Sequence, residues 1–273
     1  KKNVAPRFLG GEEPKTRGKD RRAVAAAWIT SQDNPYFTRN VANLVWEQFF
    51  GVGIVHEPDD VRVSNPPRNP ALLDALAARL IEVRYDLKRL VREIVTSAAY
   101  QRSVQPTQRN ASDGRNASHA RVRRLRAEVL LDALSQVTDA PTKLPGLPLG
   151  ARAIRIPDGA TTTYFLETFG RPRREGVCTC EVRTDPNLGQ ALHLLNGKSV
   201  SDKIRAGKVV AKLVKAKRPL AEILDELYLR SLTRYPTPKE RQRLSARIKG
   251  DSVRDLEDVL WALLNSKEFL FQH

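Results

Sequence analysis

Helix-start signals recur along this chain and constrain its fold more than any other feature. They are Asn34-Pro35, Asn69-Pro70, Asp185-Pro186 and Thr237-Pro238, and each precedes apolar residues at helical spacing. The side-chain oxygen of Asn, Asp or Thr accepts a hydrogen bond from a free N–H of the first helical turn, and proline fits the first helical position. At Thr237, the glutamate three residues later completes a capping box. The pattern predicts a chain built mainly from helices, without a central sheet.

The spacing of the apolar residues gives the expected extent of each helix. In the helix expected at 34–50, the apolar side chains expected to face the core are Phe37, Val41, Leu44 or Val45, and Phe49. Residues 140–185 hold several Pro and Gly and are expected to be irregular, with a short strand at Ala153–Ile156. The three tryptophans, Trp28, Trp46 and Trp261, are expected to be largely buried. Helices are expected at 21–30, 34–50, from 70 and from 86, and at 121–134, 188–195, 220–232, 238–248 and 253–266.

Two helical lobes are expected, so the predicted fold class is all-α with a long irregular segment around 140–185. The predicted boundaries are a polar arm at 1–19, a lobe at 20–104, a linker at 105–120 and a second lobe at 121–273. The linker is predicted from the low hydrophobicity of its residues. The sequence has no methionine, which suggests a piece of a longer protein, and no apolar run long enough to cross a membrane.

An internal echo links the two predicted lobes. Asp86-Leu87-x-x-Leu90-Val91-x-x-Ile94-Val95-x-Ser97-x-x-Tyr100 matches Asp255-Leu256-x-x-Val259-Leu260-x-x-Leu263-Leu264-x-Ser266-x-x-Phe269 in register. Any amphipathic helix gives such a stripe, and only the Ser-x-x-aromatic ending is specific. If a helical unit is duplicated, Leu90, Ile94, Val259 and Leu263 should all be buried.

The chain is strongly basic, with a net charge of +16. This charge fits either a solvated surface or a polyanionic partner such as an acidic polysaccharide, a nucleic acid or an anionic membrane face. Neither basic stretch contains the interleaved aromatic residues on which single-strand binders stack bases, so a nucleic acid is the less favoured partner. The stretches are Arg115, Arg121, Arg123, Arg124 and Arg126, and Lys203, Arg205, Lys208, Lys212, Lys215, Lys217 and Arg218.

Common catalytic and cofactor motifs are missing from the sequence. There is no C-x-x-C-H haem attachment site, no Walker A loop, no Rossmann glycine pattern, no H-E-x-x-H and no G-x-S-x-G. No cofactor and no metal are therefore expected. Asp59-Asp60 fits paired catalytic carboxylates, but in a proline-rich loop such a pair is more typical of a turn.

The loop from Phe169 to Glu181 is the most unusual constellation, because it holds three arginines and both cysteines. Arg171, Arg173 and Arg174 are candidates for binding a carboxylate, sulfate or phosphate, or they brace the loop by pairing with acids such as Glu175 and Glu181. Cys178 and Cys180 are unpaired structural thiols, a disulfide with each other or outside the chain, or metal ligands together with His193.

Ordered motifs extend through roughly residues 20–273. They are Ala27-Trp28-Ile29-Thr30-Ser31, Asp33-Asn34-Pro35-x-Phe37-x-Arg39, Asn43-x-x-Trp46, Phe50-Gly51-x-Gly53-Ile54-Val55, Pro67-x-x-Pro70, Phe169-Gly170-Arg171-Pro172, Cys178-x-Cys180-Glu181, Gln190-Ala191-Leu192-x-Leu194-Leu195-Asn196-Gly197 and Trp261-Ala262-Leu263-Leu264-Asn265-Ser266. With these motifs the chain resembles the planctomycete-type PSD1 domain (DUF1553). It departs from the family pattern at Leu44, where an arginine is common, and at Val61-Arg62, which replaces an aromatic-glycine pair.

The resemblance implies a C-terminal module of large exported cell-envelope or periplasmic proteins that often carry a cytochrome c domain. It implies no reaction, since none is established for the family. The expected function is a non-catalytic scaffold or interaction module that docks on neighbouring domains or an acidic polymer. The alternatives are an enzyme domain acting on a polysaccharide or sulfated glycan, with its site at the Arg171–Cys180 loop, and nucleic-acid binding through the basic surface.

Overall fold

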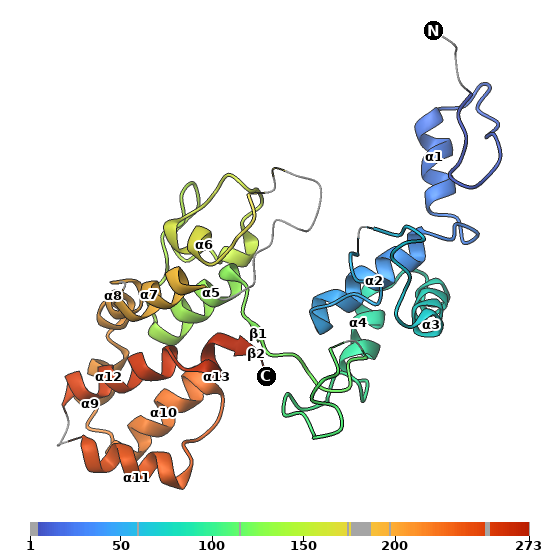
Figure 1. The fold of residues 1–273 in the computed structure, drawn as a ribbon. Helices are drawn as coiled ribbons and strands as arrows, with labels where there is room; N and C mark the ends of the chain where they lie inside the picture. Colours follow the sequence, from blue (N-terminus) through green and yellow to red (C-terminus); the bar gives the residue numbers. More distant parts are fainter. Residues whose placement is uncertain are drawn as a thin grey trace. The chain divides into compact units, whose positions relative to one another are not determined.

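The structure is a computed structural model that describes residues 5–58, 60–114, 116–173, 175, 187–196, 198–248 and 252–272. Helices dominate it, and the described residues form a single sheet of two short strands (Figure 1). The predicted all-α class is confirmed. The chain divides into two compact units, Lys1–Arg121 (unit 1) and Val122–His273 (unit 2), and each is described by itself.

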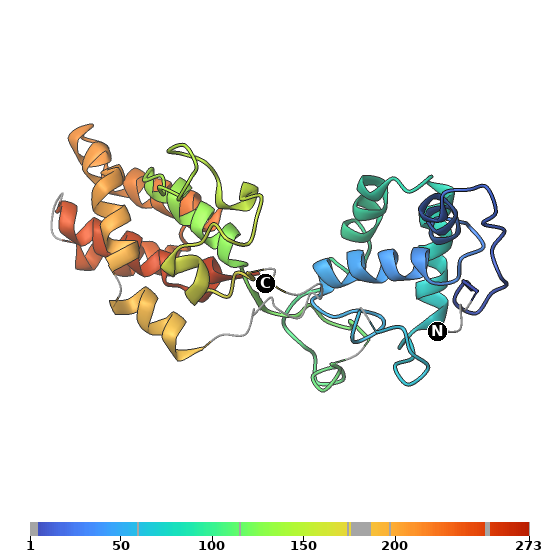
Figure 2. The same ribbon diagram turned by 90° about the horizontal axis from the view of Figure 1, so that it is seen from above.

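Unit 1 contains α1 (Arg21–Ile29), α2 (Phe37–Phe50), α3 (Pro70–Glu82) and α4 (Leu87–Val95). Helix α2 contacts both α3 and α4 (Figure 2). Side chains on two sides of α2 pack into two small apolar clusters. Ala42 and Trp46 belong to one of them, whereas Val41, Val45 and Phe49 lie half-buried against the other.

Of the two helix-start signals read in unit 1, Asn69 caps its helix and Asn34 does not, and the helix expected from residue 86 is capped by Asp86. The Asn69 side chain accepts from Leu72 N at 3.0 Å, and Asp86 accepts from Arg89 N at 3.1 Å. Asn34 does not cap α2, because its Oδ1 atom accepts from the N–H groups of Tyr36 and Phe37 in a turn that precedes the helix. The predicted inward stripe of α2 is confirmed at Val41, Val45 and Phe49, which pack half-buried against one cluster, but it omitted the most buried residues of the helix, Thr38, Ala42, Asn43 and Trp46.

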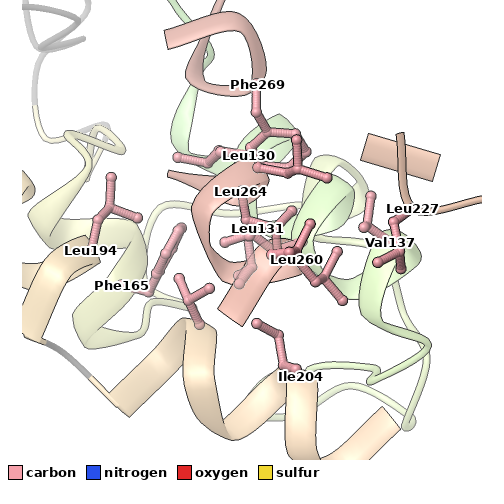
Figure 3. Packing of buried hydrophobic residues seen from close by; sticks show 14 of the residues in the cluster. Leu130, Leu131, Val137, Phe165, Leu194, Ile204, Leu227, Leu260, Leu264 and Phe269 are labelled. Atoms are coloured by element: carbon pink, nitrogen blue, oxygen red, sulfur yellow. The ribbon is translucent and has the colours of Figure 1, made fainter. Parts of the chain in front are cut away.

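Unit 2 is built around α5 (Ala127–Thr138) and α12 (Val253–Leu264). Leu130 and Leu131 of α5 meet Leu260 and Leu264 of α12 in its apolar core (Figure 3). The same core takes side chains from the surrounding helices. These are η1 (Ala153–Arg155), α6 (Tyr164–Thr168), α7 (Leu188–Asn196), α8 (Lys198–Gly207), α9 (Val209–Lys215), α10 (Leu220–Leu232), α11 (Pro238–Arg247) and α13 (Lys267–Leu270).

Two local predictions in unit 2 were wrong. The helix expected from Arg121 begins only at Ala127, because β1 (Arg123–Arg124) is extended and pairs antiparallel with β2 (Phe271–Gln272). The strand expected at 153–156 is the 3-10 turn η1. The carboxylate of Asp132 accepts from the N–H groups of Ala153, at 2.7 Å, and Ile154, at 3.2 Å, and thereby holds this turn.

The internal echo is confirmed at the level of packing. Leu90, Ile94, Val259 and Leu263 are all buried. The same hydrogen bond follows the end of both helices. It runs from Tyr100 N to Ser97 Oγ at 3.3 Å in unit 1 and from Phe269 N to Ser266 Oγ at 3.2 Å in unit 2. The starts differ, because Asp86 is an N-cap, whereas Asp255 lies in the first turn of a helix capped by Ser252.

The prediction that the three tryptophans are largely buried is confirmed in that none of them is exposed, and Trp46 is the most buried, at 8% exposed. Trp28 and Trp261 are half-buried. Trp28 stacks on Phe8, with ring centroids 4.9 Å apart and planes within 4°. Part of the N-terminal arm therefore packs on α1, although the sequence suggested an unpacked segment.

Candidate anion-binding site

Arg171, the first of the three candidate anion-binding arginines, is buried inside unit 2. Its side chain is 3% exposed, and its guanidinium group donates to the carbonyl oxygens of Thr161, at 2.6 Å, and Asp158, at 2.5 Å. Nε lies 3.2 Å from Oε1 of Glu128 on α5. A buried charge requires this kind of pairing and hydrogen bonding. In the described residues, Arg171 therefore braces the loop against α5.

The local backbone explains how Arg171 is turned inward. Helix α6 ends at Thr168, and Gly170 follows with φ 81°, a left-handed conformation that favours glycine. Gly170 N donates to Glu167 O at 3.0 Å and Arg171 N to Leu166 O at 2.9 Å, which is a Schellman ending. From outside the loop, Arg124 Nη2 donates to Phe169 O at 2.8 Å. The Phe-Gly-Arg motif is thus a helix ending held from inside the protein.

The remaining candidate residues of this loop are Arg173, Arg174, Cys178 and Cys180, and only Arg173 is among the described residues. Arg173 is exposed and lies 3.2 Å from Glu167 Oε1, so it presents its charge at the surface. Arg174, Cys178 and Cys180 lie outside the described residues. The anion-binding and thiol predictions for this loop therefore stay predictions.

The second basic stretch lies on α8 and α9. Val200, Ile204, Val209 and Val210 are buried in the core of unit 2, which leaves the opposite sides of both helices exposed. The exposed cations form what we call the basic surface, which consists of Arg205, Lys208, Lys212, Lys215 and Lys217. Lys212 and Lys215 are neighbours on α9, three residues apart. Lys212 Nζ lies 3.8 Å from Asp139 Oδ2.

Lys203 belongs to the same stretch but points into the protein. Its Nζ donates to Ala140 O at 2.7 Å and to Ser135 Oγ at 3.0 Å, so it ties α8 to the end of α5. Ser135 Oγ also lies 3.0 Å from Thr142 Oγ1. Burial lowers the pKa of Lys203 to about 8. The sequence reading counted Lys203 with the surface charges, and the apolar residues Val200 and Ile204 around it were the signal that it faces inward.

His193, a proposed metal ligand with the cysteines, lies on α7 in an aromatic surrounding. Its ring is 5.6 Å from that of Phe165 and 5.8 Å from that of Phe169, and its Nε2 is 3.0 Å from Ser199 Oγ. Burial lowers the pKa of His193. These contacts are those of a neutral histidine packed against the core.

The comparison with known families agrees with the motifs. The model of the PSD1 family, described as a protein of unknown function (DUF1553), matches residues 21–248. The chain is a PSD1 (DUF1553) protein. No curated protein and no solved structure matches it. In the part of this PSD1 chain that the structure describes, no helix is both long enough and apolar enough to cross a membrane.

Proposed function

We propose that this PSD1 chain is a non-catalytic interaction module that docks on an acidic polysaccharide through the basic surface of α8 and α9. The observation that carries the proposal is the exposure of five cations along one short segment, with Arg205 on α8, Lys212 and Lys215 on α9, and Lys208 and Lys217 directly flanking α9. Between residues 198 and 218 the sequence has a single acid, Asp202. The charge on this surface is therefore not balanced within its own segment.

Unbalanced like charges on neighbouring helical positions repel each other and lower stability. A polyanion removes this repulsion and releases its own counterions when it binds. The buried apolar sides of α8 and α9 fix the backbone that carries the cations, so little backbone ordering is needed on binding. A cationic surface on a fixed backbone, with Lys212 paired to Asp139 and little other acid in its own segment, is the arrangement that suits an acidic polymer.

A polysaccharide fits this surface better than a nucleic acid. The segment Lys198–Arg218 contains no aromatic residue on which a base could stack. Docking rather than catalysis is favoured because Arg171, the best candidate for an enzyme's anion site, uses its guanidinium group on Glu128 and two carbonyl oxygens. The family resemblance supports a place in the cell envelope or periplasm, beside other domains of a longer protein such as a cytochrome c domain.

The proposal is tested by titrating the 273-residue protein with heparin, polygalacturonate and duplex DNA at several salt concentrations. The test variant is Lys208→Gln/Lys212→Gln/Lys215→Gln. The matched control, Arg84→Gln/Lys88→Gln/Arg92→Gln, removes the same charge from exposed positions of unit 1. We expect the test variant alone to lose most of the affinity for the polysaccharides. Its salt dependence should be weaker, with the slope of log K against log salt less negative by up to about 3.

Three results would contradict the proposal. Equal losses in both variants would indicate a nonspecific effect of net charge. Tighter binding of DNA than of both polysaccharides would favour the nucleic-acid alternative. Release of reducing ends from either polysaccharide, lost on Arg173→Gln but not in the test variant, would favour the enzyme alternative.

A further inference from the structure

Helix α7 has two opposite sides, and only one of them packs on unit 2. On that side Leu194 is buried in the core (Figure 3), and Gln190 Nε2 donates to Thr168 O at 3.1 Å, which attaches the helix to the end of α6. His193 packs on the aromatic rings of the same core. The sequence of α7, LGQALHLLN, contains no Lys, Arg, Asp or Glu. The outward side of the helix therefore holds no acidic or basic side chain that would solvate it.

Four residues form this outward side, and all of them are apolar and exposed. They are Leu188, Ala191, Leu192 and Leu195. Leu188 is 74% exposed, Leu192 47% and Leu195 53%, although leucines at this spacing are typical of the side of a helix that faces a core. A group of neighbouring exposed apolar side chains marks an interaction surface, whereas scattered single ones do not.

The spacing of the four residues indicates which kind of partner fits. They occupy positions i, i+3, i+4 and i+7, which are neighbours on the surface of a helix. Four residues of one helix form the hole that receives one side chain, the knob, of a facing helix. Ala191 lies between Leu188 and Leu195, and its small side chain leaves room for the knob. This geometry favours a second helix with an apolar stripe as the occupant.

The surrounding charge selects among such helices. Helix α7 leads into the segment Lys198–Arg218, in which many cations accompany a single acid, Asp202. A helix that lies along α7 and extends past its C-terminal end meets these cations. A second copy of this chain would bring its own net charge of +16 to the same place and be repelled. Acidic side chains beside the apolar stripe are attracted there instead.

We propose that the outward side of α7 docks an acidic amphipathic helix of a partner domain, whose apolar stripe is flanked by Glu and Asp. One apolar side chain of that helix enters the hole beside Ala191, and Leu188, Leu192 and Leu195 pack around it. Its carboxylates lie toward the cations that follow α7. None of the four outward residues belongs to the basic surface, so this docking is distinct from the binding of a polysaccharide.

The test titrates the 273-residue protein with a peptide of three heptads that has leucine at positions a and d, glutamate at e and g, and alanine elsewhere. We expect binding at micromolar concentration, with NMR shift changes centred on α7. Leu188→Gln/Leu192→Gln should weaken binding at least about 10-fold, because two apolar contacts are lost. The matched control Leu149→Gln/Ile154→Gln removes two exposed apolar side chains of unit 2 outside α7 and should bind as the wild type does.

A second variant separates the hole from general apolar character. Ala191→Phe fills the hole but enlarges the apolar surface. It should weaken binding of the peptide about 10-fold, whereas a nonspecific apolar attraction would become stronger. Because Ala191 is exposed, this variant should keep the fold of the wild type.

Other outcomes overturn the proposal. No binding of the peptide, or equal affinity for the same peptide with lysine at e and g or with its leucines in scrambled order, would refute it. Unchanged affinity in either α7 variant would refute it too, as would shift changes away from α7 in the wild type, which need no variant to fold.

Two further results would assign the surface to another occupant. Self-association of the wild type that Leu188→Gln/Leu192→Gln abolishes would assign it to a second copy of this chain. Binding of phosphatidylglycerol vesicles in place of the peptide, lost in the same variant, would assign it to a membrane. Heparin affinity should be equal in the wild type and both α7 variants, so this proposal and the polysaccharide proposal fail separately.

Discussion

Arg171 shows how burial decides what a charged residue can do. Its guanidinium group is enclosed by Glu128 and two backbone carbonyls, so an external anion would have to displace all three partners. Removing one partner of a buried pair leaves the other charge uncompensated, which commonly costs about 3–5 kcal/mol. Because Glu128 is 21% exposed, the loss here should lie at the lower end of that range.

We therefore predict that Arg171→Gln lowers the free energy of unfolding of unit 2 by about 3 kcal/mol, measured by urea denaturation. The matched variant Arg173→Gln, at an exposed position two residues away, should change it by less than about 1 kcal/mol. If Arg171→Gln left the free energy of unfolding unchanged but abolished sulfate binding, Arg171 would be a ligand-binding residue and not a structural one.

Lys203 gives a pH-dependent prediction. Its pKa in the folded protein is about 8, below the usual 10.5, because burial penalises the ammonium form. Between these two values the unfolded chain binds more protons than the folded protein, so the free energy of unfolding should rise as pH increases from about 8 to 10.5. Below pH 8 both states are protonated and this contribution is constant.

The measurement is the unfolding free energy of Lys203→Met relative to the wild type at several pH values. The variant should lack the rise between pH 8 and 10.5, whereas Lys239→Met, at an exposed position, should keep it. NMR of ¹³C-methylated lysines should show one resonance titrating near pH 8. A flat difference between wild type and Lys203→Met would contradict the pKa shift.

Helix starts were the best predicted elements, because their signals are local. Asn69, Asp86 and Thr237 cap the helices that the sequence assigned to them, and Thr237 forms the capping box with Glu240. Helices α6, α8 and α9 were not predicted. The N-cap of α9 is Lys208 in a left-handed conformation, φ 56°, which carries no capping signal. The late start of α5 depends on pairing between Arg123–Arg124 and Phe271–Gln272, a contact too distant in sequence for local patterns to reveal.

The site was less predictable than the fold, for a related reason. Charge identified the segment that carries the basic surface, but it could not separate the inward Lys203 from its exposed neighbours. Unit 1 contains a cavity of about 360 Å³ whose lining includes Asn40 and Asn65, and these two residues meet only because of the path of the chain after Gly51. Val61 and Arg62, where this chain departs from its family pattern, were the available signal, and both line the cavity.

Element packing gives a third prediction, at the end of α8. Gly207 is buried against the end of α5, and a Cβ atom there would overlap the carbonyl oxygen of Thr138. Gly207→Ala must push the two helices apart and should lower the melting temperature, with a cost of at least about 2 kcal/mol. Gly189→Ala, in the exposed first turn of α7, should not lower the melting temperature, because alanine favours a helix over glycine by up to about 1 kcal/mol. Similar melting temperatures for the two variants would show that α8 and α5 do not pack this closely.

At the scale of the whole molecule, the cores are separate. Leu260 belongs to the large cluster of unit 2, and Leu80 to a small cluster of unit 1 that shares no residue with it. Between the units' helices, residues 103–120 contain no helix or strand in their described part, and Ala120 N donates to Ser103 O at 3.0 Å, which closes this segment into a loop. Among the described residues no apolar cluster takes members from both units, so each unit obtains its stability from its own core.

The final prediction follows from this separation. Leu260→Ala and Leu80→Ala each remove a fully buried side chain and should cost about 2–5 kcal/mol. Hydrogen exchange should speed up throughout unit 2 in the first variant and throughout unit 1 in the second, with the other unit unchanged. Because unit 1 has the smaller clusters, its protection should be the first to disappear in urea. Faster exchange in both units from either substitution would mean that the two units unfold cooperatively and that neither is stabilised by its own core alone.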